Sequence, residues 1–152
     1  MSIELEEQYD RLYRYCYFRL RHQQQAEDVT QETILRYLEH YPGLSGSAAM
    51  KCLYTIARNL CTDQRRSFPE QPLEETIVGI SPEDDWILSV SVRSALGALP
   101  PQEQELLLLR YVSQVPVSSI AGLLGISRFS AYRKLKTAAG NFRQALEGGS
   151  KP

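Results

Sequence analysis

Apolar residues recur at helical spacing through most of the chain, and this pattern predicts an all-α fold. Two helices are expected over residues 4–22 and 26–41, because apolar side chains return there every three or four positions. A third is expected over 47–66, after the helix-breaking sequence Pro-Gly-Leu-Ser-Gly at 42–46. The residues expected to face the core of these helices are Leu5, Tyr9, Leu12, Tyr13, Cys16, Tyr17, Leu20, Val29, Ile34, Leu35, Leu38, Leu53, Ile56, Ala57 and Leu60.

The apolar pattern lapses over residues 67–80, where two prolines and the lack of a strong period predict a linker. Ser-Pro-Glu-Asp at 81–84 then has the composition of a helix start, with a Ser cap, Pro at the first helical position and an acid that can close a capping box. This helix should end at Leu-Pro-Pro, residues 99–101, and a largely buried helix should follow over 102–112. The residues expected in its core are Trp86, Ile87, Val90 and Leu96.

Residues 117–136 predict a helix, a tight turn and a second helix. Gly125 can take the left-handed conformation that ends the first helix, and Ser127 can cap the second. We interpret the pair as a helix-turn-helix with a recognition helix over 128–137 that continues to about residue 146. A weak point is expected at Gly140 and a frayed tail at 148–152. The residues expected on the core face of the pair are Ile120, Ala121, Leu124, Ala131 and Leu135.

The other face of this recognition helix is rich in donors that suit phosphates and base edges in a DNA major groove. These donors are Arg128, Ser130, Tyr132, Arg133, Lys134 and Lys136. The alternative interpretation is a pair of packed helices whose basic face is simply solvated. The same two interpretations apply to the third helix, which could follow a nucleic-acid backbone or remain in water. Its polar face carries Lys51, Thr55, Arg58, Thr62 and Arg65, with Asn59 and Arg66 beside them.

Charge is divided unevenly along the chain, although the net charge is only −1. Residues 1–66 are balanced, with nine basic and nine acidic side chains. Residues 67–92 contain six acids and no base, and residues 93–152 contain eight bases and three acids. A neutral first part, an acidic connector and a basic last part indicate two domains with different partners.

Composition argues against several classes of protein. The three cysteines form no CxxC pair and are expected to be reduced and buried, rather than redox-active or zinc-binding. No Ser/His/Asp or paired-carboxylate constellation is apparent, so we expect no enzyme activity, no cofactor and no metal site. No apolar run reaches a membrane span and no signal peptide is apparent, so we expect a cytoplasmic protein that is not inserted in a membrane.

Three stretches in order resemble the extracytoplasmic-function sigma factors, the smallest, two-domain group of the bacterial sigma-70 family. Ala-Glu-Asp-Val-Thr-Gln-Glu-Thr at 26–33 resembles one segment of the family's region 2. Cys-Leu-Tyr-Thr-Ile-Ala-Arg-Asn-Leu at 52–60, followed by Asp63, Arg65 and Arg66, resembles the next segment. Ala-Leu-Pro-Pro-Gln-Glu-Gln-Glu-Leu at 98–106, Leu-Arg-Tyr at 109–111 and the helix-turn-helix resemble region 4.

This resemblance implies two small helical domains joined by an acidic linker. The implied boundaries are region 2 over 1–66, the linker over 67–81, region 4 over 82–147 and a flexible tail over 148–152. It also implies an alternative sigma factor that binds core RNA polymerase and directs promoter-specific initiation. In the family, region 2 docks on the β′ clamp helices and opens the minus-ten element, while region 4 holds the β flap and reads the minus-thirty-five element.

Residue roles implied by the resemblance are assigned by position. The implied core-polymerase contacts are Asp28, Gln31 and Glu32. The loop over 41–49 would receive a flipped base of the minus-ten element. The implied minus-ten DNA contacts are Lys51, Arg58, Asn59, Asp63 and Arg66. The implied minus-thirty-five DNA contacts are Arg128, Ser130, Tyr132, Arg133 and Lys136.

The chain also departs from the family's pattern. Cys52 stands where a Trp is usual, Phe129-Ser130 replaces Gly-Thr, and Thr-Ala-Ala-Gly at 137–140 replaces an Arg-rich stretch. We therefore expect looser packing near the minus-ten site and weak DNA affinity for region 4 alone. The resemblance also implies an anti-sigma factor as partner and a monomer when free. The alternatives are a sigma-like protein that docks on polymerase or an anti-sigma factor without initiating transcription, and a stand-alone helix-turn-helix regulator.

Overall fold

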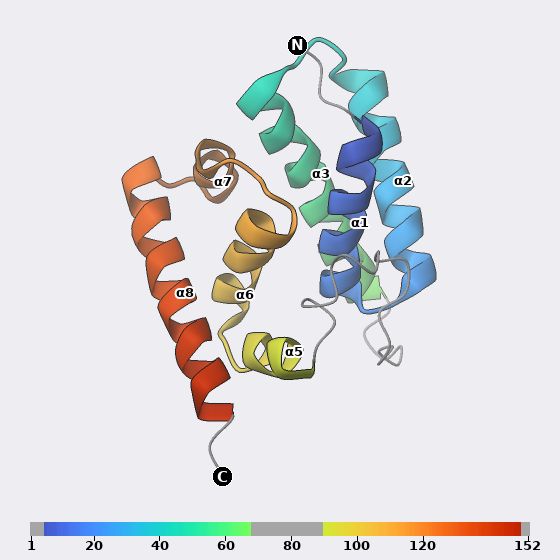
Figure 1. The fold of residues 1–152 in the computed structure, drawn as a ribbon. Helices are drawn as coiled ribbons and strands as arrows, with labels where there is room; N and C mark the ends of the chain where they lie inside the picture. The colour runs from blue at the N-terminus through green and yellow to red at the C-terminus, as the bar shows by residue number, and fades with distance from the viewer. Residues whose placement is uncertain (1–4, 68–89, 150–152) are drawn as a thin grey trace.

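The computed structural model describes residues 5–67 and 90–149, and every regular element in these two ranges is a helix (Figure 1). Three helices form the first domain and pack pairwise against one another. They are α1 (Leu5–Leu20), α2 (Gln23–His40) and α3 (Gly46–Ser67). The second domain consists of α5 (Val90–Gly97), α6 (Pro101–Leu107), the π-helix η2 (Leu108–Val112), α7 (Val117–Leu124) and α8 (Arg128–Gly149). The predicted all-α class with two helical domains is confirmed.

The join between α1 and α2 is shorter than predicted. The first helix ends at Leu20 rather than at residue 22, because Arg21 adopts a left-handed backbone with φ of 53°. The second helix begins at Gln23 rather than at residue 26. His22 makes this early start possible, because its Nδ1 accepts a hydrogen bond from the backbone N–H of Gln25, with 3.3 Å between the two nitrogens, and so caps the helix.

The buried face of α2 differs from the predicted one. Leu35 and Leu38 are 49% and 46% exposed, so their prediction as core residues is wrong. Thr30 and Thr33 are fully buried instead, and each hydroxyl donates to the carbonyl four residues earlier at 2.7 Å. These threonines can enter the core because the helix itself satisfies their hydroxyls. Of the predicted positions, Val29 is buried and Ile34 is partly buried.

Helix α3 begins at Gly46, so the loop before it covers only residues 41–45 rather than the expected 41–49. Leu53 and Ala57 face the core as predicted, but Ile56 and Leu60 are only partly buried. The buried stripe is turned toward Met50, Tyr54 and Cys61. Cys61 and Cys16 of α1 are both fully buried; a hydrogen bond between the two thiols, together with burial, raises the pKa of Cys61 above the usual range. Cys52 is half-buried.

In the second domain the predicted helix start at 81–84 and the predicted core residues Trp86 and Ile87 lie outside the described residues. Val90, predicted in the core, is 72% exposed, so that prediction is wrong. Helix α6 starts with a proline at its first position, where the missing amide costs nothing. Helix α8 continues through Gly140 without a break and reaches Gly149, beyond the expected start of the tail at residue 148.

One hydrophobic core joins the two domains. Leu12 and Leu53 from the first domain belong to the same cluster of buried side chains as Leu109 and Ile120 from the second. Helix α3 packs against α7, and α1 packs against η2 (Figure 1). A smaller cluster around Ala138 holds α8 onto the rest of the second domain. The two domains are therefore packed together rather than separate.

Candidate nucleic-acid interface

The turn between α7 and α8 has the geometry that its sequence predicts. Gly125 adopts a left-handed backbone with φ of 69°, and the amide of Ile126 donates to the Ala121 carbonyl at 3.0 Å. Ser127 caps α8, because its Oγ accepts a hydrogen bond from the backbone N–H of Ser130 at 3.1 Å. The predicted helix-turn-helix is thus present, with its turn fixed by backbone conformation and by a side-chain cap.

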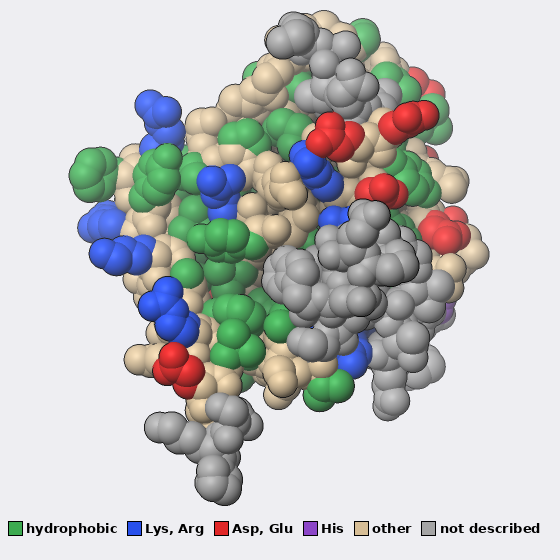
Figure 2. Space-filling model, viewed as in Figure 1, with side chains coloured by type: hydrophobic (Ala, Val, Ile, Leu, Met, Phe, Trp, Pro, Cys, Tyr) green, Lys and Arg blue, Asp and Glu red, His purple; other side chains and the backbone are tan. Residues whose placement is uncertain are grey.

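The basic residues of α8 form one exposed surface. Ala131 and Leu135 are buried against the domain, which turns the other side of the helix to solvent. Arg128, Tyr132, Arg133, Lys134 and Lys136 are exposed, and half-buried Ser130 accepts a hydrogen bond from the Arg133 guanidinium at 3.2 Å. None of these cations forms an ion pair within the described ranges. Figure 2 shows Lys and Arg side chains following this edge of the molecule, while Asp and Glu gather over α1 and α2.

The residues implied in polymerase docking lie on one face of α2. Asp28, Gln31 and Glu32 occupy positions i, i+3 and i+4 of the helix. Glu32 pairs with Arg36 at 2.8 Å, and both side chains are about half exposed, at 44% and 50%. Asp28 and Glu32 also line a groove between α2 and α3, to which Asp63 contributes from α3. Asp63, one of the residues implied at the minus-ten DNA, is exposed at this groove.

The other residues implied in minus-ten binding are divided between two environments. Arg58 forms an ion pair with Glu105 of α6, with 2.9 Å between Nε and Oε1. Lys51 lies along α7, where a Cβ added to Gly122 would meet the lysine Cδ at 2.9 Å. Both cations therefore face the second domain in this arrangement. Arg58 is half-buried, whereas Lys51, Asn59, Asp63 and Arg66 are exposed.

Glu105 is the centre of a polar cluster between the domains. Its Oε1 accepts hydrogen bonds from the Tyr15 hydroxyl at 2.8 Å and from the Arg19 guanidinium at 3.3 Å, besides the ion pair with Arg58. Arg19 also donates to the Tyr15 oxygen at 2.7 Å. The Glu105 side chain is only 12% exposed. Burial, and next the charge of Glu105, raise the pKa of Tyr15, so its hydroxyl stays protonated and acts as a donor.

Two further contacts join the domains away from this cluster. Ser119 of α7 donates to the Ser47 carbonyl at 2.8 Å, and Ser113 donates to the Arg11 carbonyl at 2.8 Å. The helical pattern predicts none of these residues at an interface between domains, and it does not predict that Tyr15 is fully buried. Tyr15 and Glu105 are 90 positions apart, and no spacing rule relates side chains so distant along the chain.

An apolar cavity of about 330 Å³ opens between α5, η2 and α8. Leucines line it together with Val92, Tyr111, Val112, Ala139 and Phe142, and Arg143 lies at it. Such a cavity is suited to an apolar side chain of a partner, since water gains few hydrogen bonds there.

Within the described part of the chain, no group of three or more His, Cys, Asp and Glu side chains could hold a metal ion. The described helices also include none with the length and hydrophobicity needed to cross a membrane.

A helix-turn-helix with an exposed basic helix, packed on a second helical domain, defines a DNA-binding protein of two helical domains. Family comparisons agree with both parts: the sigma-70 region 2 model matches residues 5–67, and the sigma-70 region 4 model matches residues 89–138. The chain belongs to the sigma-70 family, in its extracytoplasmic-function group.

Similar proteins include several sigma factors. The chain is 35% identical to the ECF RNA polymerase sigma factor BldN of Streptomyces coelicolor, over 89% of this chain and 58% of that protein. It is 30% identical to the probable RNA polymerase sigma factor RfaY of Xanthomonas campestris, over 80% of this chain and 34% of that protein. It is 25% identical to the ECF RNA polymerase sigma factor SigW of Bacillus subtilis, over 77% of this chain and 73% of that protein. The chain thus spans 58% and 34% of the lengths of BldN and RfaY.

Proposed function

We propose that this protein is an alternative sigma factor, which binds core RNA polymerase and directs it to a particular set of promoters. The observation that carries the proposal is the presence, in one chain, of an acidic groove between α2 and α3 and an exposed basic face on α8. The first surface suits a basic protein surface and the second suits DNA. In this proposal region 2 spans 1–66, the linker 67–81, region 4 82–147 and the tail 148–152.

The first domain binds polymerase and the minus-ten element in this proposal. Asp28, Gln31 and Glu32 dock on the β′ clamp helices, and the place of Asp28 and Glu32 in the α2/α3 groove supports this role. The minus-ten DNA contacts come from Asn59, Asp63 and Arg66, and from Lys51 and Arg58 once the second domain has moved away.

The second domain binds the minus-thirty-five element and the β flap. The DNA contacts are Arg128, Ser130, Tyr132, Arg133 and Lys136. All of them except half-buried Ser130 are exposed on α8, which supports the assignment. The apolar cavity between α5, η2 and α8 receives an apolar side chain of the flap. The protein acts as a monomer in the cytoplasm without a cofactor or catalysis, and an anti-sigma factor covers its polymerase-binding faces until it is released.

Run-off transcription tests the proposal directly. Purified core RNA polymerase is incubated with a library of genomic fragments, with and without this protein. New discrete transcripts that share two upstream elements would support a sigma factor and give its promoter consensus. Binding to core polymerase without new transcripts would overturn initiation in favour of the sigma-like docking protein. DNA binding without binding to core polymerase would overturn the proposal in favour of a stand-alone regulator.

A further inference from the structure

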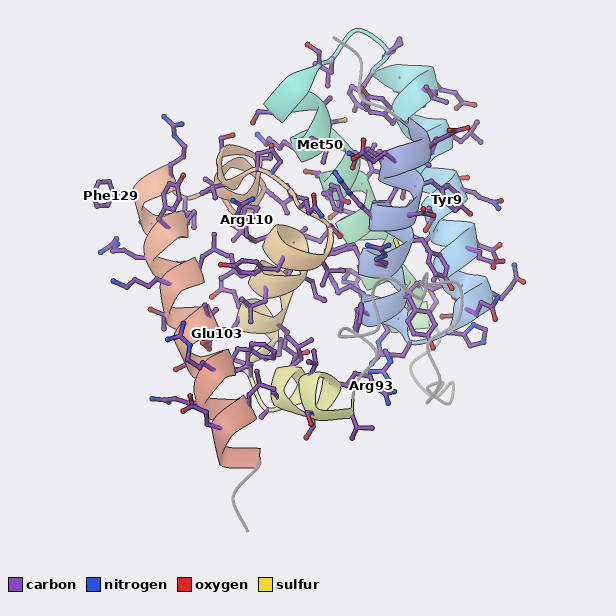
Figure 3. The ribbon with its side chains drawn as sticks, in the orientation of Figure 1. Tyr9, Met50, Arg93, Glu103, Arg110 and Phe129 are labelled. Carbon is purple, nitrogen blue, oxygen red and sulfur yellow. The ribbon has the colours of Figure 1, made fainter. Side chains whose placement is uncertain are left out.

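Phe129 is an unusually exposed aromatic side chain at the start of α8. It is 78% exposed, the highest value among the exposed large hydrophobic residues of the described chain. It packs against neither of the two hydrophobic clusters and lines none of the cavities described. Figure 3 shows its ring standing clear of the α8 ribbon and pointing away from the rest of the molecule. A ring this exposed adds little burial energy to the fold, so it is available to contact a partner.

The surroundings of Phe129 indicate which kind of partner covers it. Positions 129, 132, 133 and 136 are spaced i, i+3, i+4 and i+7, so Phe129 shares a helix face with Tyr132, Arg133 and Lys136. Arg128 precedes it in the chain, and Glu147 is the one acid in α8, five turns further on. A face with this charge attracts a polyanion. An apolar protein surface would instead have to desolvate the flanking cations.

DNA presents one apolar group in its major groove, the C5 methyl of thymine. Aromatic side chains such as Phe can contact this methyl, and they add sequence information that phosphate contacts lack. The first residues of a recognition helix are the ones that reach base edges in helix-turn-helix proteins. Phe129 is the second residue of α8, directly after the Ser127 cap and Arg128.

We propose that Phe129 is a specificity-determining residue that packs on a thymine methyl in the minus-thirty-five element. This inference rests on the proposed sigma function and deepens it, because it assigns a base preference to a residue outside the implied DNA-contact set. The cations of the face hold the helix on the phosphates, and Phe129 distinguishes thymine from the other bases. Removing either partner of the contact, the ring or the methyl, abolishes the same preference.

Single-methyl substitution tests the contact. Core RNA polymerase loaded with this protein is bound to a promoter fragment obtained from the transcription experiment, and each thymine of the minus-thirty-five element is replaced in turn by deoxyuridine. With the unaltered protein, one replacement should lower affinity about fourfold, the effect of one buried methyl-sized group. With Phe129→Ala, that replacement should have no further effect, while Phe129→Leu should restore part of it. Gln144→Ala, an exposed change near the far end of α8, should behave like the unaltered protein.

Several outcomes would overturn the inference while leaving the sigma function standing. The first is a minus-thirty-five element that contains no thymine. The second is that no deoxyuridine replacement changes the affinity. The third is that a replacement lowers the affinity of Phe129→Ala as much as that of the unaltered protein. A fourth is weaker binding of Phe129→Ala to core polymerase itself, which would place the ring against a protein partner. Failure of the proposed function looks different, because the unaltered protein would then start no promoter-specific transcripts at all. Circular dichroism of each variant confirms that α8 is intact.

Discussion

Arg133 lies in the middle of the exposed face of α8, where its guanidinium can reach either a phosphate or a base edge. We expect Arg133→Ala to weaken promoter binding about tenfold without changing affinity for core polymerase. If the arginine contacts a phosphate, the slope of log affinity against log salt should fall by about 0.9. Filter binding of the holoenzyme across a salt series measures both quantities.

Arg143 provides a matched control for this experiment. It is exposed on the same helix, ten positions further along, at the cavity proposed for the β flap and not among the proposed DNA contacts. Arg143→Ala should therefore leave the salt slope unchanged. A loss of core-polymerase binding in Arg133→Ala would contradict the assignment of α8 as the recognition helix.

A single substitution at Glu32 can test the proposed docking face of α2. Glu32→Lys reverses a charge that we propose to meet a basic clamp surface, so affinity for core polymerase should fall at least tenfold. The fold should survive, because the Glu32–Arg36 pair is about half exposed and such pairs contribute about 0–1 kcal/mol to stability. Surface plasmon resonance with core polymerase measures the affinity. Glu6→Lys makes the same charge change on the exposed start of α1 and should have little effect, whereas equal affinities for all three proteins would rule out this docking face.

At the scale of the element, the turn before α8 depends on one backbone conformation. Gly125→Ala places a Cβ on a left-handed residue and should lower the free energy of unfolding by about 1–2 kcal/mol. Gly43→Ala is the control, because its added Cβ meets nothing within 4 Å and its φ lies outside the left-handed region. Thermal unfolding followed by circular dichroism compares the two, and an equal effect of both would show that the left-handed conformation is not what stabilises the turn.

The sequence predicts the turn before α8 better than the buried face of α2, for a physical reason. The cap at Ser127 and the left-handed Gly125 were predicted correctly, because local chemistry decides both. The inner face of α2 was predicted less well, since Leu35 and Leu38 looked like core residues by hydrophobicity alone. Their exposure depends on how α2 is rotated against α1 and α3, and buried threonines made that rotation possible.

At the scale of the whole molecule, the packing of the two domains could not be predicted from the sequence. Arg58 looked like a free cation of a solvated or DNA-binding face, yet it pairs with Glu105 in the other domain. Tyr15, outside the predicted stripe of α1, is buried between Tyr54 of α3 and Glu105 of the second domain. Helical periodicity describes each helix by itself, whereas these residues are defined by a contact between parts far apart in the chain.

This packing bears on how the protein could engage a promoter. The minus-ten and minus-thirty-five elements are separated by about 25 base pairs, or about 85 Å of duplex at about 3.4 Å per base pair. A compact chain of 152 residues has a radius of gyration of about 15 Å. It therefore cannot contact both elements at once, and the two domains must separate before the proposed promoter complex can form. Separation would also release Arg58 and Lys51 for DNA.

The Glu105 cluster is the contact whose loss should favour that separation. Glu105→Ala removes the acceptor of Tyr15, Arg19 and Arg58 together, and loss of a largely buried charged partner costs about 3 kcal/mol. We expect the radius of gyration, measured by small-angle X-ray scattering, to rise from about 15 Å to above about 20 Å as the domains come apart. Helix content should stay the same, since each domain retains its own helices.

Glu103→Ala makes the same change two residues away, where the carboxylate accepts a hydrogen bond from Asn141 within the second domain. Its radius of gyration should therefore stay at the value of the unaltered protein. Glu105→Gln keeps an oxygen acceptor for Tyr15 but loses the charge that attracts both arginines. Its radius of gyration should therefore lie between those of Glu103→Ala and Glu105→Ala. If Glu105→Ala stays compact, the apolar contacts of α3 with α7 are sufficient to hold the domains together, and polymerase would have to overcome those contacts instead.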